Sequence, residues 1–495
     1  MRRTAWIAAI GVLALAGCGG GGSGSDESFD LGPRHWGVPF AASTLATQMV
    51  IGVRNLDTEG TTATLQGYKP DGTPYPGPVG VVLDGTDEER FEISDALGGA
   101  SPEGGWILAS TPSQKVEVYF TERIDAKFAE EASRAIPLPD LGAPLVPFAT
   151  GANITAQTSA LQIANVTSTP VTVTVTPFET AIDPTDPPLE GTDVFVVLGP
   201  FESQQFLPVD LTGSPFTTGS LRLTAATPFF VAGVEDLAWD IPRASPTLRS
   251  VHCALTFGRI PAAISDFHDF VMIARNDTDG TETVTILEIR DPDGGVILVS
   301  PRTVQIPPRA SLTFTTVDPL FNDLFGNVLL APFVRDVHME LQVPEGVDVA
   351  FRQFDPVVLG FNATMVPMPT GFVMDVMDVI PDPLNLLDRR TVVTMMNPQS
   401  IAINVNVSSL ISEPDGFDGS PIPIGTFTVP PNGRLDFSPD GLVFLDRDLL
   451  PVSFIGLRFT SNASFAVTGV RARLAPAAIV ISLSPLVVRV REQAE

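Results

Sequence analysis

Cysteine is nearly absent from this chain of 495 residues, which contains only Cys18 and Cys253. No disulfide framework can therefore hold the fold together, and each domain needs a hydrophobic core of its own. Hydrophobic residues make up 44% of the chain, which is enough for packed cores. Cys253 lies in an apolar run at residues 251–255, which predicts a small buried side chain rather than a reactive thiol.

Positive charge and long apolar runs are also scarce. The chain carries 29 Lys and Arg against 57 Asp and Glu, so its formal net charge is −28. Phosphate groups repel such a chain, which argues against nucleic acid as a partner and against attraction to anionic membrane surfaces. After the N-terminal segment no run of about 18 apolar residues occurs, so we expect no transmembrane helix.

Sequence signatures of catalysis are missing. The four histidines fall in different units or linkers and show no metal-ligand spacing, and they are His35, His252, His268 and His338. The HExxH, CxxC and GxSxG motifs do not occur. We therefore expect isolated, packed or surface histidines and a protein that is not an enzyme.

The N-terminal segment has the composition of an export signal. Arg2 and Arg3 precede an apolar stretch at residues 5–16, which is too short to span a bilayer. The residues directly before Cys18 resemble the lipobox of bacterial lipoprotein precursors, and they are Leu15, Ala16 and Gly17.

This resemblance implies that residues 1–17 are removed and that a covalent lipid on Cys18 anchors the protein to a membrane. Residue 19 is Gly rather than Asp, which by the same resemblance favours the outer membrane of the cell envelope. Residues 18–32 are rich in Gly and Ser and predict a flexible tether between the lipid and the folded part.

Beyond the tether the chain contains four copies of one layout. Each copy begins with an apolar run that ends in Asn, at Asn55, Asn165, Asn276 and Asn397. The spacings between these residues are 110, 111 and 121. A strand with alternating apolar and polar residues follows each Asn, and in three copies a Pro-Asp-Gly turn comes next.

Each copy contains about seven short strand patterns and closes with two that predict a hairpin, such as residues 105–110 with 115–120. Only residues 126–134 have a helical composition. The sequence thus predicts an all-β, antiparallel fold. We divide the chain into a signal peptide (1–17), a tether (18–32), four repeats (33–140, 141–256, 257–370 and 371–485) and a C-terminal tail (486–495).

The repeats resemble the immunoglobulin-like modules that occur in tandem in exported bacterial proteins, in which an Asn-ended strand, a Val/Thr strand and a Pro-Asp-Gly turn recur. This resemblance implies four tandem Ig-like β-sandwich domains. It also implies a role as spacer, adhesive stalk or carbohydrate-facing platform. Pro-rich segments between repeats, such as residues 136–139 and 366–369, predict stiff joints in a string of separate beads.

Acidic turns raise the alternative of a calcium site. The candidate ligands lie in turns of the third and fourth repeats, at Asp277, Asp279, Asp291, Asp293, Asp415 and Asp418. Ca²⁺ takes six to eight oxygen ligands, although no EF-hand spacing is complete and Asp-Gly is common in ordinary turns. Both interpretations stay open, and apart from the lipid we expect no cofactor.

Two further residue types allow a core role or a ligand role. Methionines crowd one stretch and would suit Cu(I) or irregular core gaps: Met365, Met368, Met374, Met377, Met395 and Met396. Trp36, Trp106 and Trp239 would suit sugar stacking or core anchoring.

We expect a non-enzymatic cell-envelope lipoprotein that acts as a structural stalk or as an adhesion and protein-interaction module. The alternative is a ligand-binding module for glycans or divalent cations at the cell surface. The candidate partners are the membrane, reached through the lipid, and an envelope protein or glycan.

Overall fold

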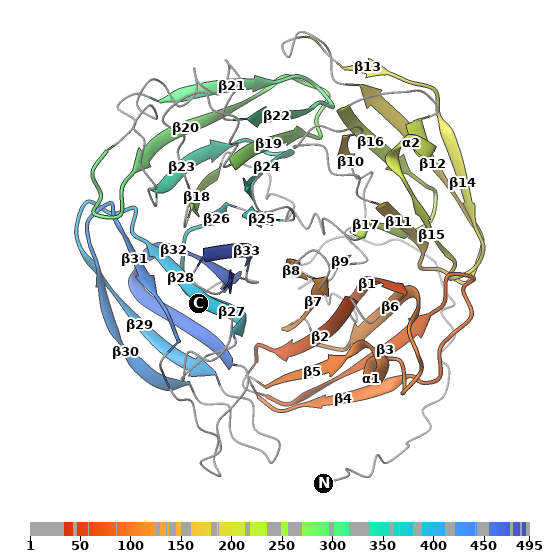
Figure 1. The fold of residues 1–495 in the computed structure, drawn as a ribbon, viewed down its shortest axis with the longest axis horizontal. Helices are drawn as coiled ribbons and strands as arrows, with labels where there is room; N and C mark the ends of the chain where they lie inside the picture. Colours follow the sequence, from red (N-terminus) through yellow and green to blue (C-terminus); the bar gives the residue numbers. More distant parts are fainter. Residues whose placement is uncertain are drawn as a thin grey trace, which may run out of the picture. The chain divides into compact units, whose positions relative to one another are not determined.

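The computed structural model describes residues 34–491 apart from gaps at 43–46, 58, 86, 114, 125–128, 135, 138–144, 150–159, 180–185, 187, 213–217, 235–248, 256–269, 297–300, 316–336, 356–360, 366, 380–388, 411–420, 441, 443–454, 476–478 and 486–487. The predicted signal peptide, lipobox, Cys18 and tether lie outside these residues. The described chain is all-β and antiparallel (Figure 1), and within it no helix is long and apolar enough to cross a bilayer.

The first repeat forms two antiparallel sheets, with strand orders β4-β3-β6-β1-β9 and β5-β2-β7-β8. Its elements are β1 (Arg34–Ala42), β2 (Thr47–Asn55), β3 (Thr61–Tyr68), β4 (Val79–Leu83), β5 (Glu88–Glu92), α1 (Ile93–Ala96), β6 (Glu103–Thr111), β7 (Val116–Ile124), β8 (Ala129–Arg134) and β9 (Ile136–Pro137). Side chains from both sheets, including Val38, Ile51 and Ile107, share one hydrophobic core, which makes the repeat a β-sandwich.

The second repeat has the same two-layer build, with one sheet of β10, β16, β12, β13 and β14 and another of order β15-β11-β17. Its elements are β10 (Leu145–Ala149), β11 (Ala160–Asn165), β12 (Val171–Glu179), β13 (Leu189–Glu190), β14 (Val194–Leu198), β15 (Ser203–Phe206), α2 (Pro208–Thr212), β16 (Thr218–Thr224) and β17 (Phe229–Val234). The alternation seen in the sequence has its expected effect: Val173 is buried in the core while Thr172 is exposed.

The third repeat forms sheets of order β21-β20-β23-β18-β26 and β22-β19-β24-β25. Its strands are β18 (Arg249–Leu255), β19 (Phe270–Asn276), β20 (Glu282–Arg290), β21 (Arg302–Ile306), β22 (Ser311–Thr315), β23 (Val337–Val343), β24 (Val347–Asp355), β25 (Phe361–Met365) and β26 (Met368–Pro369). Strand β18 precedes the boundary predicted after residue 256, yet it pairs with β23 and β26, so strand pairing places it with the third repeat.

In the fourth repeat the two layers are joined by one long strand, β32, which pairs with β27 and β29 in its first part and with β28 in its second. The strands are β27 (Gly371–Val379), β28 (Arg389–Met396), β29 (Ile403–Leu410), β30 (Ile422–Val429), β31 (Arg434–Phe437), β32 (Ile455–Ala475), β33 (Ile479–Pro485) and β34 (Val488–Arg491). Strand β34 lies within the predicted tail and pairs with β27.

The predicted closing hairpins are wrong. In the first repeat β6 pairs with β1 and β3, whereas β7 pairs with β2 and β8, so the two consecutive strands lie in opposite sheets. The same separation holds for β16 and β17 and for β23 and β24. Period-2 alternation shows that one face of each strand is buried, and it does not distinguish a neighbour in one sheet from a strand across the core.

Two further local expectations are wrong. Residues 129–134 form strand β8 rather than a helix, because pairing with β7 outweighs the helical preference of Ala and Glu. The Pro-rich segments that we expected to act as joints include β9 and β26, which pair with the first strand of their own repeats, β1 and β18. Proline suits these positions because an edge strand leaves one side of its backbone unpaired.

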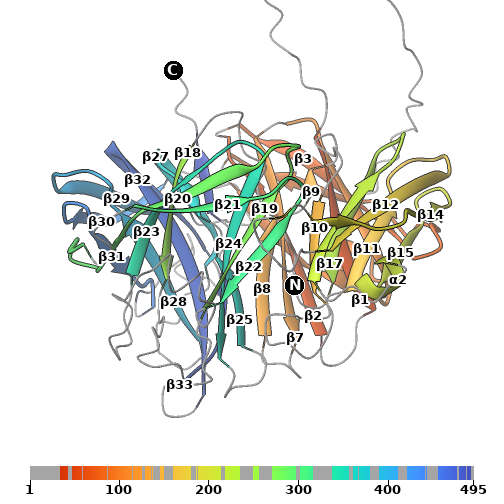
Figure 2. The same cartoon turned by 90° about the horizontal axis from the view of Figure 1, so that it is seen from above.

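The four sandwiches contact one another in cyclic order in a propeller-like arrangement (Figure 1), instead of forming a string of separate beads. Hydrogen bonds join the first sandwich to the second, the second to the third, and the third to the fourth. The fourth contacts the first through Gly456 and Arg54 and through Met377 and Tyr119. Strands β8, β25 and β33 meet in the middle of this ring (Figure 2).

Candidate functional site

The repeated Asn fastens the same loop in each sandwich. In the third repeat, Asn276 Nδ2 donates to the carbonyls of Gly280 at 2.7 Å and Ile306 at 2.9 Å, and Asn276 Oδ1 accepts the Thr278 amide at 2.8 Å. The equivalent side chains make the same pattern of bonds and are all buried, and they are Asn55, Asn165 and Asn397. The motif that reveals the repeat is therefore structural.

The Pro-Asp-Gly turns build the joints between sandwiches. The carbonyl of Pro70 accepts the amide of Ser203 in the second sandwich at 3.0 Å, and the carbonyl of Pro292 accepts the amide of Arg434 in the fourth at 2.9 Å. Gly294 has a φ of 91°, and a Cβ there would lie 2.5 Å from the Pro431 carbonyl oxygen. Glycine is required at this turn because the backbone of the next sandwich approaches so closely.

The turns at Gly72 and Gly294 each pack against a left-handed residue of the following sandwich, and the third sandwich has such a residue at the equivalent position. Phe201, Arg309 and Asn432 occupy equivalent positions with φ of 57°, 60° and 49°. One side chain of the preceding sandwich forms a hydrogen bond to the backbone of each. Trp106 Nε1 donates to the Phe201 carbonyl at 2.9 Å, and Ser220 Oγ donates to the Arg309 carbonyl at 3.1 Å.

His338 is the third member of this series. It pairs with Arg290 across the sheet as Trp106 pairs with Tyr68, and its ring bonds the backbone of Asn432. That bond favours the protonated ring, so the acceptor is the Asn432 carbonyl. The position equivalent to Trp106 and His338 thus forms the same contact in three joints with three different side chains.

The joint between the fourth and first sandwiches differs at this position. Gly456 pairs with Leu410 as Trp106 pairs with Tyr68, so the equivalent residue has no side chain. The guanidinium of Arg54 fills the space, and a Cβ on Gly456 would lie 1.8 Å from Arg54 Nη1. Arg54 is buried and forms an ion pair with Glu88 at 2.8 Å, so a buried ion pair fills the joint between the fourth and first sandwiches.

The joint between the first and second sandwiches is sealed by aromatic rings. Tyr68 stacks on Trp106 and on Phe201, with ring centroids 4.9 Å and 4.6 Å apart, and Phe230 meets Trp106 edge-on at 5.4 Å. Phe230 also covers Gly37, where an added Cβ would lie 2.8 Å from its ring. Aromatic packing of this kind excludes water from the joint.

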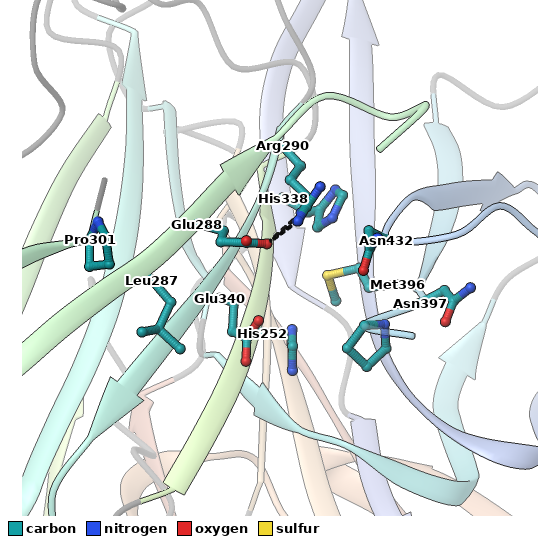
Figure 3. A pocket seen from close by; sticks show the side chains of 11 residues that line it. His252, Leu287, Glu288, Arg290, Pro301, His338, Glu340, Met396, Asn397 and Asn432 are labelled. Carbon is teal, nitrogen blue, oxygen red and sulfur yellow. Dashed lines mark hydrogen bonds and ion pairs between the residues drawn. The ribbon is translucent and has the colours of Figure 1, made fainter. Parts of the chain in front are cut away.

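The joint between the third and fourth sandwiches, which we call the third joint, holds a pocket of about 360 Å³ (Figure 3). The joint between the first and second sandwiches, the first joint, has aromatic packing instead. Its polar wall comes from β18, β20 and β23 of the third sandwich and consists of His252, Glu288, Arg290, His338 and Glu340. The fourth sandwich contributes the opposite wall with Met396, Asn397, Pro398 and Asn432. The pocket is the candidate functional site because a concave surface here combines apolar side chains with several converging polar ones.

Strand register shows how this pocket replaces the aromatic seal. His252 pairs with Glu340 as Gly37 pairs with Leu108, so an imidazole stands where the first joint has no side chain. Opposite, Ala466 pairs with Met396 as Phe230 pairs with Ala164, so a methyl group stands where the first joint has a phenyl ring. The third joint thus lacks the phenyl ring of the first, and ionisable side chains line its pocket.

The charges in the pocket are unevenly compensated. Arg290 binds Glu288 through Nε at 2.6 Å and through Nη2, and its Nη1 donates to the Gly294 carbonyl at 2.8 Å. Glu340 accepts a hydrogen bond from Ser250 Oγ at 2.6 Å and forms no ion pair with any residue that the structure describes. With Glu288 neutralised by Arg290, the carboxylate of Glu340 supplies the excess negative charge.

The two histidines are buried and neutral near pH 7. Burial, followed by the charge of Arg434, lowers the pKa of His338 to about 4. Burial also lowers the pKa of His252, against the opposing effect of the Glu340 carboxylate. His338 Nδ1 is buried without a hydrogen-bond partner. A neutral imidazole has one nitrogen with a free lone pair, and His338 offers Nδ1 as that acceptor when Nε2 carries the proton.

This site is not apparent in the sequence, where the histidines fall in different units or linkers. The structure brings His252 and His338 onto one face of a sheet, although they are far apart in the chain. The available signal was alternation: each histidine is flanked by apolar residues that face the core, so each must face away from it. What that outer face contacts depends on the joint, which the pattern does not encode.

The candidate calcium ligands are dispersed. Asp279 binds Arg309 at 2.5 Å, Asp291 Oδ1 accepts the Gly295 amide at 2.7 Å within its own turn, and Asp293 is exposed. The Asp277 carbonyl accepts a bond from Arg309. Asp415 and Asp418 lie outside the described residues. Within the described part of the chain, no three His, Cys, Asp or Glu side chains are grouped to hold a metal ion.

The methionine, tryptophan and cysteine candidates lie mostly in cores. Met374, Met395 and Met396 belong to the fourth core, Met377 packs with Tyr119, and Met368 packs partly buried on the fourth core. Trp36 is in the first core. The side chain of Met365 is not among those that the structure describes, and Trp239 and His268 lie outside the described residues.

Cys253 is fully buried, as predicted, and burial raises the pKa of its thiol to about 12. The remaining histidine, His35, bonds Ser110 Oγ at 2.8 Å on the first sandwich. No protein-family model matches this chain, and no curated protein matches its sequence, so the assignment of function depends on the residues and geometry described above.

Proposed function

We propose that this protein is a non-enzymatic, lipid-anchored protein of the cell envelope whose four Ig-like sandwiches act together as a protein-interaction module. The lipid on Cys18 would hold it in a membrane, with the outer membrane favoured, and the residues 18–32 would serve as the tether. The cyclic contacts between sandwiches support a rigid platform better than an extended stalk.

The observation that carries the interaction role is an exposed apolar edge on the second sandwich. Strand β14 pairs with β12, and its outward residues Phe195 and Val197 are 64% and 62% exposed. Leu189 on neighbouring β13 is 64% exposed as well. An exposed edge strand with apolar side chains offers both backbone groups and surface area to a partner strand.

The third sandwich provides an internal comparison. Its equivalent strand, β21, carries Thr303 and Gln305 where β14 carries Phe195 and Val197, because both strands pair in the same register with the strand that follows the repeated Asn. The first sandwich has the exposed Val82 at the position of Val197 but Gly80 at that of Phe195, so the pair of apolar residues is found on β14 and is not a requirement of the fold.

Site-specific photo-crosslinking in intact cells tests the interaction role. A photoreactive residue at position 195 should trap one envelope partner, and the same residue at position 303 should not. Phe195→Ser with Val197→Thr should abolish the crosslink obtained from a probe at position 189. Equal trapping at positions 195 and 303 would refute the role of this edge.

Two measurements test the anchor and the platform. Cys18→Ala should move the protein from the membrane to the soluble fraction and remove incorporation of labelled palmitate. X-ray scattering of residues 33–495 should give a radius of gyration of about 23 Å for one compact body, whereas four separate sandwiches would give roughly twice that value.

A second candidate function, binding of a small ligand, is favoured by the pocket of the third joint. No Phe, Tyr or Trp side chain lines this pocket to stack on a sugar, and in the described part of the chain no three metal-binding side chains are grouped.

A further inference from the structure

The residues of the third joint differ from those of the first, and the difference does not serve to hold the two sandwiches together. The first joint is closed by Trp106, Tyr68 and Phe230, and the equivalent positions of the third joint hold His338, Arg290 and Ala466. Aromatic packing without water stabilises the contact between two sandwiches. Buried polar groups beside a cavity lower stability unless they have hydrogen-bond or ionic partners. A partner that enters the pocket would supply what the joint lacks.

Two acceptors that face the pocket lack a cationic or a hydrogen-bond partner among the residues that the structure describes. Arg290 has its guanidinium committed to Glu288 and to the Gly294 carbonyl. Among the described residues, the carboxylate of Glu340 has no cationic partner and His338 Nδ1 has no hydrogen-bond partner. A ligand that satisfies both must carry several N–H or O–H donors, and the charge of Glu340 favours a cationic one.

The rest of the wall restricts the ligand further. Leu287, Pro301, Met396 and Pro398 give the pocket an apolar side. A volume of about 360 Å³ lies at the small end of ligand sites. An ammonium group on a short aliphatic stem matches these features: the ammonium has three donors, and the stem packs on Met and Pro side chains.

We propose that the pocket between the third and fourth sandwiches binds a small organic cation with a primary ammonium group, seated on Glu340 and His338 with its aliphatic stem against Met396. This site goes beyond the proposed interaction module, since it needs neither the lipid anchor nor the edge of β14.

Calorimetric titration of the full mature chain in detergent tests the site. n-Butylammonium chloride is the probe, and n-butanol, with the same stem and no charge, is the matched ligand control. We expect the ammonium to bind at least tenfold more tightly than the alcohol. Tetramethylammonium, which has charge and no N–H donor, should bind as weakly as the alcohol.

Variants identify the residues. Glu340→Gln keeps the shape of the side chain and should weaken ammonium binding at least tenfold, whereas Glu345→Gln removes the same charge from an exposed turn and should leave binding unchanged. His338→Trp places the side chain of the first joint in the third and should abolish binding. Thermal melts of each variant without ligand show that it is folded.

Three results would overturn the proposal. These are equal binding of the ammonium and the alcohol, unchanged binding in Glu340→Gln, and a response to calcium chloride or glucose in place of the ammonium. Loss of crosslinking at position 195 would leave this site unaffected, so the failure of one proposal is distinguishable from the failure of the other.

Discussion

Trp106 in the first sandwich and His338 in the third occupy the same place in the repeat, and each contacts the backbone of a left-handed residue of the next sandwich. One side chain seals a joint among aromatic rings, and the other borders a polar pocket. The repeat therefore keeps the geometry of its joints while the chemistry inside them differs.

The repeated Asn should be important for stability. Asn276→Ala removes the donor to the carbonyls of Ile306 and Pro307 and leaves them buried, so we expect a loss of unfolding free energy on the order of 2 kcal/mol. Urea unfolding followed by tryptophan fluorescence measures it. Asn404→Ala is the control, since this exposed side chain bonds only Thr428 and Ser461 bonds its backbone carbonyl. A control loss as large as that of Asn276→Ala would contradict the prediction.

The joint that closes the ring should show strong coupling between two residues. Gly456→Ala places a methyl group against the buried Arg54 guanidinium, which the bond to Glu88 prevents from moving away. We expect a destabilisation of roughly 2 kcal/mol from overpacking. In the Arg54→Ala background the same methyl group should have space, so the double variant should be more stable than the sum of the single effects by at least about 0.5 kcal/mol. Strict additivity would show that the two side chains do not meet.

The unfolding free energy should decrease as the pH is lowered, because His338 becomes protonated. Its pKa is about 4 in the folded chain against 6.5 for the ordinary group, so between these values the unfolded chain binds the additional proton. The contribution of neutral His338 to the unfolding free energy is complete above pH 6.5. It is lost as the pH falls towards 4, by roughly 3 kcal/mol in total. His338→Gln should flatten the unfolding free energy across this window. An unchanged slope in the variant would mean that His338 is protonated in the fold.

The thiol of Cys253 should be protected in the native state. It is fully buried in the third core, and burial raises its pKa to about 12, so little thiolate exists at pH 8. In a Cys18→Ala chain, reaction with a disulfide reagent should be at least about 100-fold slower without urea than with it. Rapid labelling of the folded protein would show that the third core opens readily.

Much of the architecture was predictable from local pattern. The predicted strands at residues 105–110 and 115–120 correspond to β6 and β7, because alternation and turn residues are local properties. The buried state of Cys253 followed from the same reasoning. Sheet partners were not predictable, because β6 and β7 carry the same alternation whether they pair with each other or face each other across a core.

The candidate site was beyond local pattern for a different reason. His252 and Glu340 become neighbours through strand register, and the opposite wall of the pocket, with Met396 and Asn432, comes from another sandwich. Comparison of the four repeats position by position would have shown ionisable residues where the first repeat has Gly37 and Trp106. That comparison requires the correct register, which depends on the strand pairing that the sequence left open.

Contact between the first and fourth sandwiches means that no sandwich is terminal. Open arrays of repeats need special end units to cover an exposed apolar face, and a cyclic order removes that need because every unit has two neighbours. The position at which translation begins is then arbitrary with respect to packing. A circularly permuted gene that starts with the third sandwich and ends with the second should encode the same set of contacts.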